Sequence, residues 1–301
     1  MAGGRAALTK IRGMLAGVIA GAVDHVPAIE PAFVRAGHAV QRQYPLASLY
    51  YHAHTALTSR LRVSGRRYRR LTIDGITADL DITDHSARLL YFQGVPYEPE
   101  VTRRLIAAVG SGDVFVDVGA NAGFFSVLAA IRVGPPGRVV AFEPHPDARA
   151  AMRQLLARNG VADRVDVVAS AVGACVASAV KLHLTADPVL STLVPGASPL
   201  RADYSFDRAI DVPLTTIDAW LADRRDLASR IAAIKIDVEG FEGDVVAGMA
   251  STIAAAPRAI VVCETQPDSD ADRRLRAAGF GREEIEASAG GFGNYLYRRP
   301  V

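Results

Sequence analysis

The chain has 301 residues, of which 50% are hydrophobic and 22% are charged. This length suits one large α/β domain with an appendage or two small domains, and the core needs neither disulfides nor metal ions. The formal net charge of +2 gives no general reason to expect a nucleic-acid partner. The two cysteines, Cys175 and Cys263, form no zinc motif, and we expect both to be buried free thiols.

The N-terminal region combines basic residues with an apolar run. Arg5, Lys10 and Arg12 precede apolar residues from Met14 to Val23, an arrangement also found in secretion signals. Pro27 is unlike the small-residue site at which such signals are cleaved, and the run is shorter than the ~20 apolar residues that span a membrane. We therefore expect an N-terminal helix in the mature protein and a cytoplasmic location.

A hairpin pattern follows this helical region. Tyr68–Ile82 alternates apolar and polar residues around Asp74-Gly75. An Asp-Gly pair between two alternating runs predicts a β-hairpin. We therefore predict an N-terminal helical and hairpin extension over residues 1–95, followed by a larger domain over residues 96–301.

From residue 99 onward, amphipathic helices alternate with short apolar strands. The pattern predicts helices over 99–109, 124–131, 146–158, 241–249 and 270–278, and strands over 114–118, 138–142, 165–169, 231–236 and 259–263. We also expect short strands at 180–184 and 210–214, a helix capped by Thr215, and an antiparallel edge strand at 294–298. Apolar strands alternating with helices indicate an α/β, doubly wound, Rossmann-like fold with a mostly parallel sheet.

The loop after the first of these strands is the clearest ligand-binding signal. Val114–Gly123 reads VFVDVGANAG, so a strand ends near Asp117 and a glycine-rich turn opens a helix. Glycines permit a tight turn and the close approach of a ligand. The dinucleotide pattern G-x-G-x-x-G is not met, because only Gly119 and Gly123 are in place. Asp117 would repel a phosphate but suits an ammonium group, such as that of a methionine moiety.

The second strand supports the same site. It is followed directly by Glu143, which comes 26 residues after Asp117. An acidic residue at this point accepts hydrogen bonds from ribose hydroxyls in folds of this kind. The loop and Glu143 together predict a cofactor that contains a nucleoside.

Four charged residues gather around the end of the predicted strand 231–236, namely Lys235, Asp237, Glu239 and Glu242. In a doubly wound sheet this fourth strand lies beside the first, so Asp237 faces the cofactor loop. A carboxylate there can remove the proton of an acceptor hydroxyl during methyl transfer, and we predict Asp237 and Glu239 as catalytic residues. The three carboxylates also suit a hard metal ion, but we predict none.

Six arginines lie within eleven positions: Arg60, Arg62, Arg66, Arg67, Arg69 and Arg70. Such a cluster can bind an anionic acceptor or the surface of a membrane. Tyr68 is the one aromatic residue among them, so single-stranded nucleic acid is disfavoured. We favour a solvated hairpin arm over peripheral membrane contact.

The same residues resemble the FkbM family of S-adenosylmethionine-dependent methyltransferases. The similar segments are YEPEVT at 97–102, GDVFVDVGANAGFFS at 112–126, VVAFEPHP at 139–146, PLTTIDAWL at 213–221 and IKIDVEGFE at 234–242. The resemblance implies a class I methyltransferase fold with a seven-stranded sheet and S-adenosylmethionine as the methyl donor. It also implies O-methylation of a sugar, glycan or other small metabolite.

The resemblance further implies roles for individual residues. The implied donor-binding residues are Glu98, Asp117, Gly119, Asn121, Gly123, Glu143, Ser170 and Asp237, with Glu143 at the ribose and Ser170 near the adenine. One position departs from the family pattern, because Ala174 stands where an acidic residue is expected.

Two alternatives stay open at this point. One is a nicotinamide-dependent oxidoreductase, which the missing third glycine disfavours. The other is a non-catalytic protein that retains a Rossmann-like fold, which the acids at 117, 143 and 237 disfavour.

Overall fold

A computed structural model describes residues 2–40, 43, 46–64, 66–184, 191–193, 208–287 and 291–300. The chain forms two compact units. The first comprises Met1–Ile73 and Thr77–Tyr97, and the second comprises Asp74–Ile76 and Glu98–Val301. The division into separately folding domains at residue 95 stays a prediction.

The N-terminal unit is built from helices and one hairpin. Its elements are α1 (Ala2–His25), η1 (Pro27–Ile29), α2 (Glu30–Val40), α3 (Leu46–Ser64), β1 (Tyr68–Ile73), β2 (Ile76–Asp81), α4 (His85–Arg88) and η2 (Leu89–Gln93). The predicted hairpin around Asp74-Gly75 is therefore confirmed, and both turn residues have positive φ. Leu57, Leu61 and Phe92 are among the buried residues of a small core that α1 and α3 share.

Ion pairs inside this unit use half of the arginine cluster. The pairs are Arg66 with Asp24, Arg67 with Asp81, and Arg69 with Glu30. The Arg69 guanidinium donates to both carboxylate oxygens of Glu30, at 2.6 and 2.7 Å, and the Tyr91 hydroxyl donates to the same carboxylate. The expectation of a solvated arm was therefore wrong for these three arginines, since Arg66 and Arg69 join the hairpin region to α1 and α2 and Arg67 pairs with the end of β2.

No single helix among the described residues has both the length and the apolar character needed to cross a membrane. Gly13–His25 and Pro27–Val40 meet that test only when taken together, and they are bent by 108°.

The second unit contains a seven-stranded sheet in the order β11-β12-β10-β9-β3-β4-β5. Its strands are β3 (Val114–Val118), β4 (Arg138–Phe142), β5 (Val165–Val168), β9 (Ile231–Ile236), β10 (Ile260–Thr265), β11 (Gly281–Ala287) and β12 (Gly293–Arg298). The five neighbouring strands from β10 to β5 in this order are parallel to one another. β12 runs antiparallel to β10 and β11. The order reverses between β3 and β9, which is where ligands bind in such sheets.

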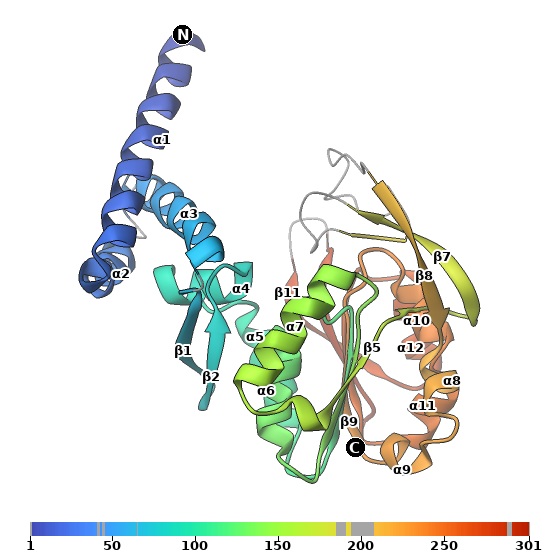
Figure 1. The fold of residues 1–301 in the computed structure, drawn as a ribbon. Coiled ribbons are helices and arrows are strands. Elements are labelled where there is room, and N and C mark those ends of the chain that lie inside the picture. Colours follow the sequence, from blue (N-terminus) through green and yellow to red (C-terminus); the bar gives the residue numbers. More distant parts are fainter. Residues whose placement is uncertain are drawn as a thin grey trace. The chain divides into compact units, whose positions relative to one another are not determined.

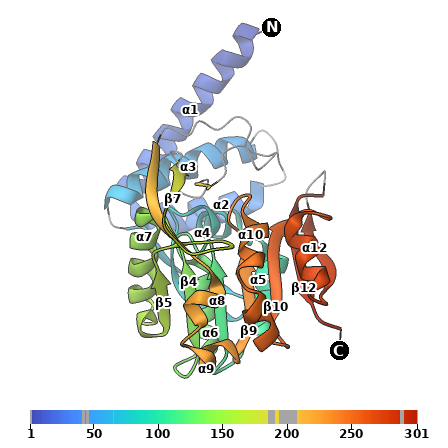
Figure 2. The same ribbon diagram turned by 90° about the vertical axis from the view of Figure 1, so that its right-hand side faces the viewer.

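Helices cover both faces of this sheet (Figures 1 and 2). One face carries α5 (Pro99–Ala108), α6 (Phe124–Val133) and α7 (Pro146–Arg158). The other carries α8 (Ile217–Leu221), α9 (Arg225–Ala228), α10 (Glu242–Ala247), α11 (Ala250–Ala255) and α12 (Asp270–Ala277). β3 is fully buried, as expected for a strand with helices on both sides. The predicted α/β doubly wound fold with a mostly parallel seven-stranded sheet is confirmed.

A second, three-stranded sheet has the order β6-β8-β7. It contains β6 (Ala171–Val172), β7 (Ala177–Leu184) and β8 (Arg208–Thr215). Thr192 is bridged to His183 of β7, and its hydroxyl donates to the carbonyl oxygen of Glu239 at 2.8 Å. This sheet is thereby joined to the loop that follows β9.

Four local expectations were wrong. β12 is not an edge strand, because β11 pairs outside it. Thr216, not Thr215, caps α8, since its hydroxyl accepts from the Ala219 amide. The single helix expected over 241–249 is instead α10, with α11 starting at Ala250. Cys263 is buried as expected, but Cys175 is exposed in the turn between β6 and β7.

We predict that Arg69→Ala destabilises the N-terminal unit by about 3 kcal/mol, because it leaves the buried Glu30 carboxylate without its cation. Amide hydrogens of α1 and α3 should then exchange roughly a hundredfold faster in hydrogen-exchange mass spectrometry. Arg70→Ala is the control, since Arg70 is the exposed next residue of β1. Equal exchange in the two variants would contradict a structural role for the Arg69–Glu30 pair.

Candidate active site

The loops after β3 and β9 approach each other so closely that one position must be glycine. Gly119 has φ +81°, and a Cβ built there would lie 1.8 Å from the Asp237 carbonyl oxygen. No side chain can occupy that space, and the left-handed backbone is strained for any residue with a Cβ. Gly123 also has positive φ, and a Cβ there would lie 2.6 Å from Met152 Cγ. Both glycines therefore have packing reasons for being there.

Asp117 lies at the end of β3 and is 1% exposed. Its Oδ2 accepts a hydrogen bond of 2.6 Å from the Ser126 hydroxyl. Its Oδ1 is buried and accepts no hydrogen bond from the described residues. Burial raises the pKa of Asp117, and the nearby Lys235 charge lowers it. A buried acceptor without a donor is costly, so this oxygen is suited to a donor that a ligand supplies.

Glu143 follows β4 and holds the glycine-rich loop by its backbone. Its Oε2 accepts from the Asn121 amide at 2.8 Å, and its Oε1 accepts from the His145 amide at 2.6 Å. Asn121 has a positive φ of 48°, so this bond supports a strained turn. Burial raises the pKa of Glu143 from its ordinary value of 4.5 to about 7. Each carboxylate oxygen has a further lone pair that a hydroxyl could use.

An ion pair lies at the end of β9, directly beside β3. Lys235 is buried, and its Nζ donates to Asp237 Oδ2 at 2.7 Å. The Lys235 ammonium also lies 4.8 Å from the ring centroid of Phe125. The sheet register pairs Asp117 with Lys235, so the ends of the two strands bring these charges together. The expectation that β9 places Asp237 next to the cofactor loop is confirmed by the register and by Gly119.

Glu264, at the end of β10, completes a cluster that the sequence did not reveal. Oxygen atoms of Asp237, Glu239 and Glu264 all lie within 4.8 Å of one another. Burial, followed by the charges of Asp237 and Glu239, raises the pKa of Glu264 to about 10, and it hydrogen bonds with Asp237. Burial and the two neighbouring carboxylates therefore favour the protonated form of Glu264, while the Lys235 ammonium lies against Asp237.

The signal for Glu264 was present but weak. It is the acidic residue that follows the apolar run VVC, at the carboxyl end of a strand next to β9. The carboxyl ends of parallel strands lie together, so acidic residues that follow neighbouring strands come close to one another. Three carboxylates at this spacing could bind a hard cation, although Lys235 already supplies positive charge to Asp237.

Glu242 does not join this cluster. Its Oε1 accepts from the amides of Gly240, at 2.9 Å, and Val238, at 3.3 Å. These bonds close the loop after β9, in which Glu239 has a positive φ of 62°. Glu242 therefore shapes the loop that positions Asp237 and Glu239.

Two expected site residues lie apart from these contacts. Ser170 follows β5 by two residues, so it lies beyond the same edge of the sheet and is half-buried. Glu98 precedes α5 and has a positive φ of 41°, and α5 packs against β9, β10 and β11. Their roles in cofactor binding stay predictions.

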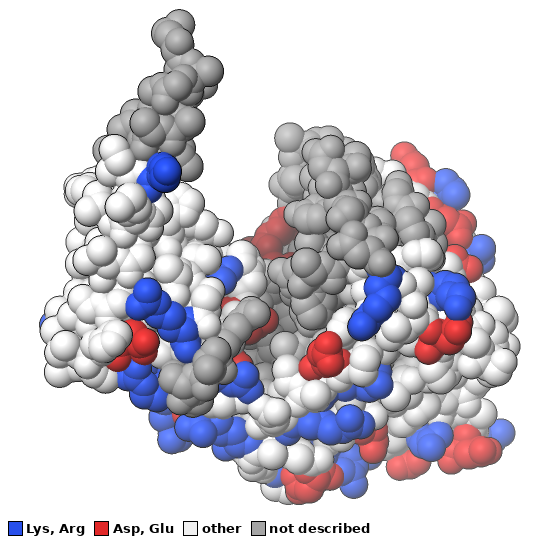
Figure 3. All heavy atoms as spheres, turned by 45° about the horizontal axis from the view of Figure 1, so that its top comes forward, with Lys and Arg blue, Asp and Glu red and all other residues white. Residues whose placement is uncertain are grey.

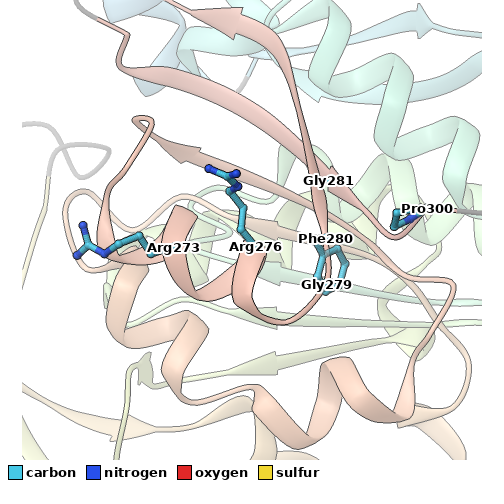
Figure 4. Close-up of a pocket in the computed structure, with 6 residues that line it drawn as sticks. All are labelled: Arg273, Arg276, Gly279, Phe280, Gly281 and Pro300. Atoms are coloured by element: carbon cyan, nitrogen blue, oxygen red, sulfur yellow. The ribbon is translucent and has the colours of Figure 1, made fainter.

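The pocket shown in Figure 4 lies elsewhere. It has a volume of about 490 Å³ and is lined by Arg273, Arg276, Gly279, Phe280, Gly281 and Pro300. Its lining comes from the end of α12, the start of β11 and the residues after β12. β12 runs antiparallel to β10, so the residues after β12 lie near the amino end of β10. The pocket is therefore at the opposite end of the strands from Glu264.

The family model for the FkbM methyltransferase domain matches residues 117–283, which is more than half of the chain. The protein belongs to the FkbM methyltransferase family. The match begins at Asp117 and includes Glu143, Asp237 and Glu264. The family uses S-adenosylmethionine as methyl donor. A sequence search of curated proteins gave no match.

Solved structures show more distant likeness. A FkbM methyltransferase from Methylobacillus flagellatus KT is 16% identical, with a TM-score of 0.43, over 90% of this chain and 58% of that one. TYW2 of M. jannaschii in complex with AdoMet is 14% identical, with a TM-score of 0.39, over 78% and 87%. Aeropyrum pernix fibrillarin with bound S-adenosyl-L-methionine is 11% identical, with a TM-score of 0.37, over 62% and 66%. These likenesses say nothing about the acceptor of this protein.

We predict that Gly119→Ala destabilises the methyltransferase unit by about 3 kcal/mol or more and abolishes binding of S-adenosylhomocysteine. The substitution adds a left-handed strain of about 1–2 kcal/mol and a clash with the Asp237 carbonyl. Gly160→Ala is the control, because its φ is also positive, at 65°, but nothing lies within 4 Å of its Cβ position. Calorimetric binding and urea unfolding measure both effects, and equal losses in the two variants would exclude the close approach as the cause.

Proposed function

We propose that the protein transfers the methyl group of S-adenosylmethionine to a hydroxyl group of a small metabolite, sugar or glycan. The observation that carries this proposal is the ion pair between buried Lys235 and half-buried Asp237 beside the glycine-rich loop. A nucleic-acid acceptor is not part of the proposal, since the formal net charge of the whole chain is only +2. The proposed location is the cytoplasm, where the donor is made.

The residues around the loop suit the donor's polar groups. The Asp117 Oδ1 atom, buried without a hydrogen-bond donor among the described residues, suits the ammonium of the methionine part. Glu143 suits the ribose hydroxyls, and we assign the loop from Gly119 to Gly123 to the methionine part of the donor. Ser170 and Glu98 are the further residues that we assign to this site. When bound, S-adenosylmethionine supplies an electrophilic methyl group on a sulfonium.

Asp237 is the proposed general base. The acceptor oxygen forms a bond to the methyl carbon as the carbon–sulfur bond breaks, and the hydroxyl proton passes to the Asp237 carboxylate. The Lys235 ammonium favours the ionised form of Asp237, and the hydrogen bond with Glu264 helps to hold the Asp237 carboxylate in one orientation. Glu239 is placed to bind the acceptor at the same edge.

A base of this kind favours oxygen over nitrogen as the acceptor atom. A neutral amine attacks a methyl group without losing a proton first, whereas a hydroxyl is a weak nucleophile until its proton is removed. Carboxylate oxygens of Asp237 and Glu239 are also hydrogen-bond acceptors, which suits an acceptor molecule that carries hydroxyl groups.

We predict that Asp237→Asn lowers methyl transfer by about a hundredfold or more, because a positioned base typically contributes that factor. Binding of S-adenosylhomocysteine should weaken much less. The control is Asp244→Asn, an exposed acid in α10. Transfer of labelled methyl groups into small molecules of a cell extract measures turnover, and calorimetry measures binding.

Normal turnover in Asp237→Asn would exclude this residue as the base. Thermal shifts supply a separate check of the donor, since a ligand that binds the folded state raises the melting temperature. Stabilisation by NAD but not by S-adenosylhomocysteine would contradict the methyltransferase proposal as a whole.

We also predict that affinity for S-adenosylhomocysteine falls as pH decreases below about 7, by up to tenfold per pH unit. The pKa of Glu143 in the free protein is about 7, and ribose hydroxyls donate to the ionised carboxylate, so binding must expel the proton. The stability of the free protein depends on pH in the opposite direction: the raised pKa of Glu143 favours the fold below about pH 4.5, and this contribution is lost as pH rises through about 7. Glu143→Gln should bind more weakly and without this dependence.

Calorimetric titrations from about pH 6 to about pH 8 test this dependence. A wild-type affinity that is constant over this range would exclude Glu143 as a contact of the ribose.

A further inference from the structure

Helix α1 has two opposite apolar faces, and only one of them is packed. Ala16, Ala20 and Val23 are buried where α1 contacts α3. At 3.6 residues per turn, a second set of large side chains lies on the opposite side of the helix. These side chains are 49% to 71% exposed: Ile11, Met14, Leu15 and Val18. Their spacing of three and four residues makes them one continuous stripe.

This exposure is specific to the N-terminal unit. Ten large hydrophobic side chains are exposed among the described residues, and nine of them belong to that unit. The larger methyltransferase unit contributes only Val176 to the same group. Val26 and Ile29 follow α1 in the chain, and their side chains are exposed as well. A concentration of this kind marks an interaction surface.

The charges of the same region favour an anionic partner. Residues 1–97 contain twelve Lys and Arg but six Asp and Glu, a net charge of +6, whereas residues 98–301 have a net charge of −4. Within α1, three basic residues, Arg5, Lys10 and Arg12, precede the first acid, Asp24, which is paired with Arg66. The space-filling view shows mostly uncharged and basic atoms on the viewer's side of this unit (Figure 3).

We infer that α1 binds the surface of an anionic lipid bilayer, lying in the interface with Ile11, Met14, Leu15 and Val18 inserted. Interfacial helices combine an exposed apolar stripe with nearby basic residues, which is the combination found here. A second copy of the chain is a poorer occupant, because a stable interface uses about 20–30 residues a side. Half of the arginine cluster at residues 60–70 forms ion pairs inside the protein, so these arginines are less available to lipid headgroups. We therefore place the contact on the apolar face of α1.

Sedimentation with lipid vesicles tests the inference. The full-length protein should sediment with vesicles of three parts phosphatidylcholine to one part phosphatidylglycerol, and less with phosphatidylcholine alone. Added salt should weaken the binding, because it screens the basic residues. The double variant Met14→Gln, Val18→Gln should lower the partition coefficient by about tenfold or more, since it removes two inserted side chains.

The matched control is Val176→Gln. Val176 is 66% exposed, close to the 71% of Val18, but lies in the methyltransferase unit. Its substitution should leave vesicle binding unchanged. Circular dichroism and binding of S-adenosylhomocysteine show that each variant is folded, so a loss of vesicle binding is not a loss of structure.

Several results would overturn the inference. One is a wild-type protein that stays in the supernatant with both vesicles, or a double variant that sediments as the wild type does. Binding that is equal on both vesicles would contradict the anionic partner. A dimer in sedimentation velocity that the double variant abolishes would identify the stripe as a contact between copies, and resistance to alkaline extraction from cell membranes would indicate a spanning segment.

Discussion

The close approach of two loops at the centre of the sheet is the constraint on which the site depends. The Asp237 carbonyl occupies the space that a side chain at residue 119 would need. This contact places the loop after β9 directly against the loop after β3, and so brings the Lys235–Asp237 pair next to Asp117. In the proposed mechanism, this approach lets the methyl donor and the base meet across adjacent strands.

Backbone geometry and electrostatics support each other in this arrangement. Asn121 and Glu239 both adopt positive φ, one in each loop, and such strain persists only where the surroundings hold it. Glu143 holds the first loop through the Asn121 amide, and Glu242 holds the second through the Gly240 amide. Two buried acids therefore shape the site by accepting backbone hydrogen bonds, in addition to any contact with a ligand.

Much of this could be predicted from the sequence, for identifiable reasons. The strands β3, β4 and β9 were placed to the residue, because continuous apolar runs between glycines and charges leave little freedom. Glu264 could not be predicted, because its importance comes from β10 lying beside β9, which no local pattern records. The edge strand β11 was missed because GREEIEA has few apolar residues and is stabilised by pairing with β12.

The electrostatics of the site depend on one buried cation among several acids. Lys235 lies against Asp237 and also lowers the pKa of Asp117, so a single ammonium stabilises charge at the ends of both strands. It also lowers the pKa of Glu264, but burial together with the charges of Asp237 and Glu239 outweighs this effect and raises that pKa. Neighbouring acids in different protonation states are the condition for one of them to act as a base while another donates a hydrogen bond. In the proposed mechanism, the position of Lys235 on β9 thus favours Asp237 over Glu264 as the base.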